Sequence, residues 1–544
     1  MDSEKIKSIA PINPFRNRKN TMKIPSIPFK MLALAPFLTE NIREDLQRPI
    51  TADRNNLDQV MANLSLALYV SLPAELCPTG RIDIPIKRIK DFHPDQMLKN
   101  NPYLKNLMDA KIFIEKSKSE GVSIKEIGNR IKEWPDLPLI HIEAETPGKE
   151  KKSDHASIDN ILSLVALPDE PGDSASQKAD LSIQIENILE EILQHIFSDE
   201  AFIKLESVWR GLNCLLKEAG TGTDVKVEIV NVSPETLNHT MDTLMAGLID
   251  DLPSLVLVDV PFDNSPLSLE HLEKIARFSE TLMAPSICWV THDFFYIENW
   301  EAFNRLPFLP NHLTGSHYAK WQKLEQSTHG RWVSVTCNRF LSRYPYGPDN
   351  KTRAIRFMEK GHSWLAPVWA VAALMTQSVF KTGWPTPFTD YPEIVLEDMP
   401  LNNKNPDKPI PTEIFFANDR VDQLLRIGII PLSSARKKDI VFASKETTVA
   451  GNSLRYQILL SALSRFIFWC LDNFDKGMPP QQIEENFTQA MVLFWEKSGD
   501  RLPKDLVISA GCPDPENRIP LRISLTPPHR LLPSGEKIEL EFRW

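Results

Sequence analysis

Glycine is scarce in this sequence and proline is abundant, which limits the kinds of site that the chain can build. There are 20 glycines and 43 prolines among 544 residues, against average usage of roughly 7% and 5%. Backbone that closely approaches a phosphate usually contains glycine, so the composition argues against a nucleotide enzyme. Collagen is excluded because it needs glycine at every third position. The length predicts several domains, built from helices and strands with stiff connectors.

Paired cysteines, excess positive charge and long apolar runs are also lacking. The six cysteines form no C-x-x-C pair, which argues against a zinc ribbon or a disulfide framework and favours a cytoplasmic protein. A net charge of −10 argues against a large nucleic-acid-binding surface. The longest apolar run, Trp364–Met375, contains Pro367 and is too short to span a bilayer. We therefore expect a buried helix there and no direct membrane insertion.

Motifs for catalysis, cofactors and metals are missing too. The sequence has no phosphate loop, no zinc-protease motif, no nucleophile elbow and no EF-hand. Asp259 ends an apolar segment that resembles a magnesium-binding strand, but a core strand is the simpler interpretation. His312, His317 and His329 do not have zinc-ligand spacing. We expect no catalytic residue, cofactor or metal; the alternative, an uncharacterised cytoplasmic enzyme, would use His292 and Asp293.

Hydrophobic periodicity predicts an α/β fold with mixed sheets and flanking helices. Met31–Leu38 mimics a signal peptide but is expected to be a buried strand. A helix is predicted to begin at His93-Pro94 and to reach about Ser119. Apolar residues from Leu181 to Ile196 have helical spacing, and Ser198 is a candidate N-cap for the next helix. Strands and helices then alternate, which is typical of a partly parallel sheet.

Two hydrophilic stretches, Glu143–Ser157 and Pro168–Ala179, have linker composition and divide the chain. The predicted organisation is a basic flexible N-terminus (1–21), a small domain (22–142), a linker with a short helix (143–180) and a large region (181–544).

Aromatic and arginine residues recur in conspicuous short motifs. They could be core residues or interface anchors, since Trp, Tyr and Arg are common at binding hot spots, and the sequence leaves both interpretations open. The residues concerned are Trp209, Arg210, Gly211, Tyr318, Lys320, Trp321, Arg339, Arg343, Tyr346, Gly347 and Pro348.

These motifs resemble the large subunit (TssC/VipB-like) of the type VI secretion contractile sheath. Order and spacing agree over most of residues 181–475. The matching segments are Phe202–Leu212 (FIKLESVWRGL), Pro261–Pro266 (PFDNSP), Tyr318–Trp321 (YAKW), Arg339–Pro348 (RFLSRYPYGP), Pro411–Ile414 (PTEI) and Leu425–Leu432 (LRIGIIPL).

The amino-terminal part resembles the small subunit (TssB/VipA-like) of the same sheath. The matching segments are Pro28–Leu32 (PFKML), Ile50–Met61 (ITADRNNLDQVM), Ile89–Asp95 (IKDFHPD) and Pro102–Leu107 (PYLKNL). The two subunits are ordinarily separate chains, so the resemblance implies that this polypeptide is a fused sheath protomer.

The resemblance implies a phage-tail-like sheath fold and a structural function. Such protomers form a helical tube around an inner tube of an Hcp-like protein, contract against baseplate components, and propel the inner tube with its effectors. A sheath-like component of another contractile injection particle is the alternative within this class.

Two further sites follow from the resemblance. In the family, neighbours exchange strands, and the alternating tail Lys537, Ile538, Glu539, Leu540, Glu541, Phe542, Arg543 and Trp544 is the candidate inter-protomer strand; an edge strand within its own sheet is the alternative. A short helix of the large subunit can be recognised by a AAA+ ClpV-like unfoldase. The residues resembling it are Ile158, Ile161, Leu162, Leu164 and Val165.

Overall fold

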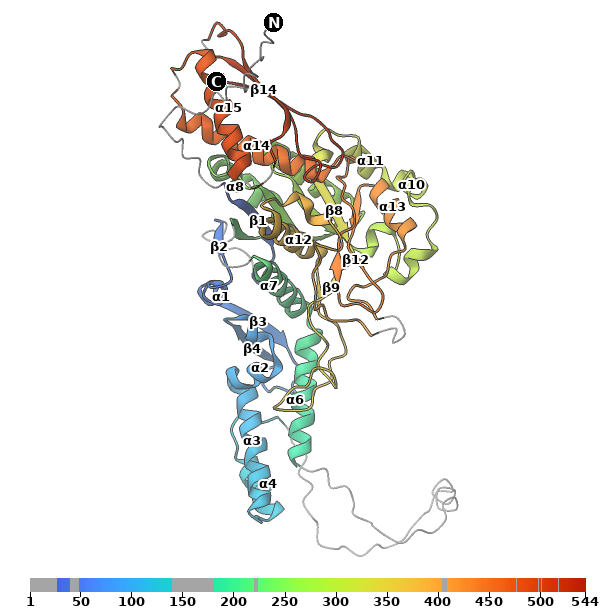
Figure 1. Cartoon of the computed structure of the whole chain (residues 1–544). Coiled ribbons are helices and arrows are strands. Elements are labelled where there is room, and N and C mark those ends of the chain that lie inside the picture. The colour runs from blue at the N-terminus through green and yellow to red at the C-terminus, as the bar shows by residue number, and fades with distance from the viewer. Residues whose placement is uncertain are drawn as a thin grey trace, which may run out of the picture.

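A computed structural model describes residues 27–39, 48–138, 181–219, 224–403 and 409–544, apart from positions 476, 498, 500 and 517. Figure 1 shows three regions along the molecule: helices α3, α4 and α6 at one end, a sheet with its helices in the middle, and the C-terminal elements at the other end. The basic N-terminus and the linker predicted from the sequence lie outside the described residues, as does the candidate unfoldase-recognition helix.

The middle region is built on a seven-stranded sheet that combines strands from both halves of the chain. All neighbours are parallel except β2, which runs antiparallel to β5. The predicted α/β class with mixed sheets and flanking helices is confirmed. In spatial order, the strands are β11 (Ile429–Pro431), β8 (Val333–Cys337), β7 (Ser286–Val290), β6 (Leu255–Phe262), β1 (Phe29–Ala35), β5 (Val225–Asn231) and β2 (Ile50–Ala52).

Strand β1 comes from the amino-terminal part but lies inside the sheet of the large region. Met31 is opposite Val227 of β5 on one side and Leu255 of β6 on the other. Every residue of β1 is buried, as expected of a parallel strand covered on both faces. Its polar residue, Lys30, forms ion pairs with Glu228 at 2.9 Å and Asp251 at 2.6 Å.

Helices cover both faces of the sheet and create two cores. Met31 and Ala33 belong to the core on the side of α7 (Glu200–Glu218) and α12 (Pro367–Thr382). The alternate residues Leu32 and Leu34 belong to the core under α8 (Leu237–Asp250) and α9 (Pro266–Leu282). The expected buried helix near Trp364–Met375 is confirmed as α12, and Pro367 begins it instead of interrupting it.

The rest of the amino-terminal part extends away from the sheet and packs against α6 (Leu181–Ser198). The single helix predicted from His93 to Ser119 is wrong: there are two helices, because Asn101 ends the first and its side chain caps the second by accepting from Leu104 N–H. The elements are α1 (Leu57–Leu64), β3 (Leu66–Ser71), β4 (Arg81–Ile86), η2 (Ile89–Phe92), α2 (Pro94–Asn100), α3 (Pro102–Ser119) and α4 (Ile124–Lys132).

Short elements complete the middle region, and one capping prediction is corrected. The N-cap of α7 is Asp199, whose side chain accepts from Phe202 N–H, and Ser198 is the last residue of α6. The short elements are η3 (His292–Phe295), η4 (Trp300–Arg305), α10 (Leu309–His312), η5 (Ser316–Tyr318), α11 (Ala319–Glu325), η6 (His329–Trp332), β9 (Phe340–Leu341), β10 (Trp364–Leu365), η7 (Thr386–Thr389), α13 (Asn418–Arg426), β12 (Ser433–Ser434) and β13 (Val441–Phe442).

The C-terminal region has its own core of helices and an antiparallel sheet. The helices are α14 (Leu454–Asn473) and α15 (Pro480–Lys497), and the strands are β14 (Lys504–Ala510), β15 (Pro520–Thr526) and β16 (Ile538–Arg543). Among the described helices, α14 alone has the length and apolar composition to cross a membrane, and 61% of that stretch is buried within the fold.

Candidate functional site

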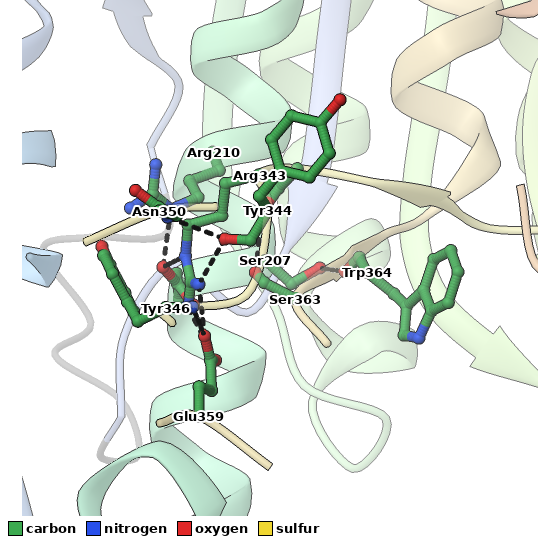
Figure 2. Close-up of polar contacts among 11 residues, drawn as sticks. Ser207, Arg210, Arg343, Tyr344, Tyr346, Asn350, Glu359, Ser363 and Trp364 are labelled. Atoms are coloured by element: carbon green, nitrogen blue, oxygen red, sulfur yellow. Dashed lines mark hydrogen bonds and ion pairs between the residues drawn. The ribbon is translucent and has the colours of Figure 1, made fainter. Parts of the chain in front are cut away.

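The arginines of the sequence motifs meet in a buried ion-pair cluster, which we call the Arg343 cluster. It consists of Glu206 and Arg210 on α7 with Arg343 and Glu359 from the segment between β9 and β10. Arg343 contacts Glu206 through two nitrogens, at 2.9 and 3.1 Å, and Glu359 through two, at 2.6 and 2.9 Å. Arg210 Nε donates to Glu206 Oε1 at 2.7 Å. Figure 2 shows Arg210 beside Arg343 and the contact of Arg343 with Glu359.

The two central side chains of the Arg343 cluster are almost completely shielded from solvent. The side chains of Glu206 and Arg343 are 2% and 9% exposed. Burial alone raises the pKa of Glu206, but the charges of Arg343 and Arg210 outweigh burial and lower that pKa to about 2. Burial lowers the pKa of Arg343, and the two carboxylates reverse this and raise it. Glu206 and Arg343 are therefore both charged at neutral pH.

Further contacts attach the segment after β9 to helix α7. The guanidinium of Arg343 lies 4.3 Å from the ring centre of Tyr346, and Tyr346 N–H donates to Glu359 at 2.9 Å. Ser207 on α7 donates to the carbonyl of Trp364 at 2.7 Å, as Figure 2 shows. Gly347 N–H donates to Asn350 O in the turn after Tyr346, and Pro348 belongs to the same turn. The cluster thus fixes a long irregular segment on a core helix.

Two other residues of the α7 motif, Trp209 and Gly211, lie in the core. Trp209 contacts Phe37, which follows β1. Trp209 donates from Nε1 to the carbonyl of Phe37 at 3.1 Å, and the two rings are 5.2 Å apart in an edge-to-face arrangement. Gly211 faces Trp369 of α12, whose ring would lie 2.3 Å from an added Cβ. Glycine is therefore required where α7 crosses α12.

Asp259 is buried in this core, where its carboxylate accepts hydrogen bonds from two tryptophans. Its Oδ1 accepts from Trp289 Nε1 at 3.0 Å, and its Oδ2 accepts from Trp369 Nε1 at 2.6 Å. Burial raises the pKa of Asp259 to about 6, although both indole hydrogen bonds act in the opposite direction. Its interpretation as a residue of a core strand agrees with these contacts.

The remaining motif residues lie elsewhere. Tyr318 and Trp321 are fully buried in the core under α9, where the Tyr318 hydroxyl donates to Phe294 O at 3.1 Å. Lys320 pairs with exposed Glu270. Arg339 forms an ion pair with Glu413 at 2.7 Å. The structure therefore gives packing or ion-pair roles to the aromatic and arginine motifs and gathers only the α7 and Arg343 motifs into one cluster.

The tail of the chain forms an edge strand in this single protomer. Strand β16 pairs with β15 from Pro520↔Arg543 to Leu525↔Ile538, and the sheet order is β14-β15-β16. Ile538 is buried, and Leu540, Phe542 and Trp544 pack partly against the C-terminal core. Exchange of this strand between protomers remains a prediction.

The histidines and the aspartate considered as candidate catalytic or metal-binding residues form local contacts within the fold. Thr291 accepts from Asp293 N–H at the start of η3, and His292 Nδ1 lies 2.9 Å from Ile297 O. His329 pairs with Glu280, and His312 lies 3.3 Å from the Tyr318 hydroxyl. Within the part of the chain that the structure describes, no group of three or more His, Cys, Asp or Glu could hold a metal ion.

Comparisons with known proteins agree on one class. Residues 180–248 and 253–449 match the VipB family model, described as "EvpB/VC_A0108, tail sheath N-terminal domain". Residues 16–133 match the model described as "Type VI secretion system, VipA, VC_A0107 or Hcp2". The chain is 25% identical over 275 residues to the type VI secretion system sheath protein TssC1 of Pseudomonas aeruginosa, covering 45% of this chain and 55% of that protein. It thus spans about half the length of this relative.

Solved structures of contractile tails are also similar at a coarse level. The sheath tail protein Lin1278 from Listeria innocua has 10% identity and a TM-score of 0.32, over 56% of this chain and 59% of that one. The helical sheath of the anti-feeding prophage in its contracted state has 10% identity and a TM-score of 0.31, over 61% and 77%.

The two family models, which together match more than half of the chain, define a contractile tail-sheath protein. The chain belongs to the type VI secretion sheath family and joins the small and the large subunit in one polypeptide. The family is structural rather than enzymatic, so the enzyme alternative is not retained.

Proposed function

We propose that this chain, which carries both subunit parts, is a protomer of a type VI secretion contractile sheath, which polymerises into a helical tube and contracts. The observation that carries the proposal is the shared sheet: β1 from the small-subunit part pairs with β5 and β6 of the large-subunit part. A single folded body that contains both subunits is the repeating unit that such a sheath requires. A head-to-tail contact that does not close into a ring produces a helical filament.

Its partners follow from this role. We propose copies of the same chain, an inner tube of an Hcp-like protein and baseplate components, in a cytoplasmic assembly. A ClpV-like unfoldase is a further candidate. The more general alternative, a component of another contractile injection particle, is less favoured because the family model that matches residues 16–133 names the type VI secretion system.

The first experiment tests assembly. The full chain is produced with an inner-tube protein and imaged by negative-stain electron microscopy. Helical tubules are expected, whereas monodisperse monomers under every condition tried would contradict the proposal. Deletion of Lys537–Trp544 should leave a folded chain that no longer forms extended sheath.

Strand exchange is tested separately by cysteine cross-linking across β15 and β16. Arg522 and Glu541 are opposite each other in the register and both are exposed. An R522C/E541C variant in a C512S background forms an intrachain disulfide when β16 stays in its own sheet. After assembly, donated strands should instead join neighbouring chains and give a ladder of covalent oligomers. R522C alone is the control, and intrachain disulfides only, in well-formed tubules, would contradict donation of this strand.

A further inference from the structure

A cleft of about 700 Å³ lies where the small-subunit and large-subunit parts meet, next to the Arg343 cluster. Both parts contribute to it, so it exists only when they are docked as in this structure. We call it the basic cleft. The residues around it are Ile89, Lys90, His93, Asp95, Gln96 and Lys99 from one part, and Arg210, Lys351, Arg353 and Ala354 from the other.

Permanent positive charges dominate the basic cleft. Five of its side chains are lysine or arginine, and its one carboxylate is already engaged: Asp95 accepts from the backbone N–H groups of Arg353 and Ala354 at 3.1 Å. Across the described residues, no carboxylate forms an ion pair with Lys90, Lys99, Lys351 or Arg353. Lys90, Lys99, Lys351 and Arg353 are all exposed, so they are free to reach a partner.

The titration of His93 reflects the same field. Burial lowers the pKa of His93, Asp95 opposes this, and the charges of Arg210, Arg343 and Arg353 lower it further. His93 is therefore neutral at neutral pH, and the positive charge of the basic cleft belongs to its lysines and arginines. An anion that enters would gain attraction from several of them at once.

We propose that the basic cleft receives carboxylate side chains from the surface of a second copy of this chain. This inference rests on the proposed function. A chain of net charge −10 carries many carboxylates, so each copy can present an acidic surface to the cleft of the next. Because both parts supply cations, one acidic segment would contact both halves of the neighbouring protomer.

The lining favours carboxylate side chains over a small phosphate ligand. No glycine lines the cleft, and the backbone N–H groups of Arg353 and Ala354 are already used by Asp95. Phosphate sites usually employ such backbone groups. Long, exposed lysine side chains instead suit a charged protein surface, where complementarity sets orientation and specificity.

The test reverses one charge in each part. K90E/K351E is compared with K132E/K438E, which changes two exposed lysines outside the basic cleft, again one from each part. The critical concentration for tubule formation, measured by sedimentation, should rise at least about tenfold for K90E/K351E. It should stay within about twofold of wild type for the control pair and for K90R/K351R, which retains the charge. Melting curves of unassembled chains establish that all variants fold.

A mixing experiment identifies the occupant. A K90E/K351E copy keeps its acidic surface but has lost its receiving cleft, so it should dock at one end of a growing tubule and stop growth there. Adding a minor fraction to wild-type chains should shorten the tubules, and K132E/K438E should not. Equal tubule lengths and critical concentrations for all variants would overturn the inference.

Two other outcomes can be distinguished from docking of a second copy: binding of a phosphate ligand and failure of the chain to assemble. Saturable stabilisation of unassembled wild-type chain by micromolar pyrophosphate, absent in K90E/K351E, would assign the basic cleft to a phosphate ligand and overturn the inference. Failure of wild-type chains to assemble at all would contradict the proposed function itself.

Discussion

Glu206 of the Arg343 cluster provides a sharp test of the buried ion pairs. In Glu206→Gln, the side chain keeps its size but loses its charge, and two arginines are left with only the carboxylate of Glu359. Breaking a buried ion pair by removing one partner costs about 3–5 kcal/mol. The lowering of the Glu206 pKa from 4.5 to about 2 gives a similar figure, about 3 kcal/mol.

The same helix supplies a matched control. Glu200 pairs with Lys204 at 2.7 Å, but its side chain is 82% exposed. An exposed pair contributes about 0–1 kcal/mol, so Glu200→Gln should change the free energy of unfolding by no more than that. Equilibrium urea unfolding followed by circular dichroism compares the two variants with wild type.

The pH dependence of the difference has a defined sign. The folded-state pKa of Glu206 is lowered, so its contribution is complete above pH 4.5 and is lost as the pH falls toward about 2. The gap between wild type and Glu206→Gln should therefore narrow below pH 4.5. Equal destabilisation by Glu206→Gln and Glu200→Gln at neutral pH would refute the argument.

Three other predictions concern the core and the junction of the two parts. Gly211→Ala should destabilise the chain by about 1–3 kcal/mol because the added Cβ would overlap Trp369. Gly247→Ala is the control, since it has open space around it, and should be neutral or stabilising by up to about 1 kcal/mol. Thermal melting compares the stability of the two variants. Asp259→Asn should reduce a pH effect. The raised pKa of Asp259 makes wild type gain stability as the pH falls through about 6, so the rise in melting temperature between pH 7 and pH 5 should be larger in wild type than in Asp259→Asn. Cleavage at a protease site inserted within 139–180 should leave the two fragments bound, as size-exclusion chromatography would show by co-elution.

The sequence predicted local elements well where one pattern dominates. The spacing from Leu181 to Ile196 predicted α6, and the apolar residues of Met31–Leu38 predicted a buried strand, most of which is β1. Helix boundaries were predicted less well, because neighbouring polar residues can each serve as the N-cap. The side chain of Asp199, and not that of Ser198, caps α7. Such a choice depends on which side chain reaches a free N–H group, and the hydrophobic pattern does not contain that information.

The Arg343 cluster could be predicted only in part. Arg210 and Arg343 stood out as motif residues, but their carboxylate partner Glu359 did not, because it belongs to an irregular segment without periodicity. Only the need to neutralise a buried arginine points to a missing acid. The basic cleft had no sequence signal either, since Lys90 and Lys351 are brought together by docking of the two parts.

The position of β1 explains how two subunits can fold together as one polypeptide. Its backbone pairs with strands on both sides, and its side chains enter both cores. Withdrawing it would leave β5 and β6 without their central partner and would expose the residues that face α7 and α8. The two parts are therefore held together by the sheet, and covalent fusion adds a fixed one-to-one ratio. The same reasoning separates β1 from β16: an internal strand is committed to its own protomer, whereas an edge strand with one neighbour can exchange at much lower cost.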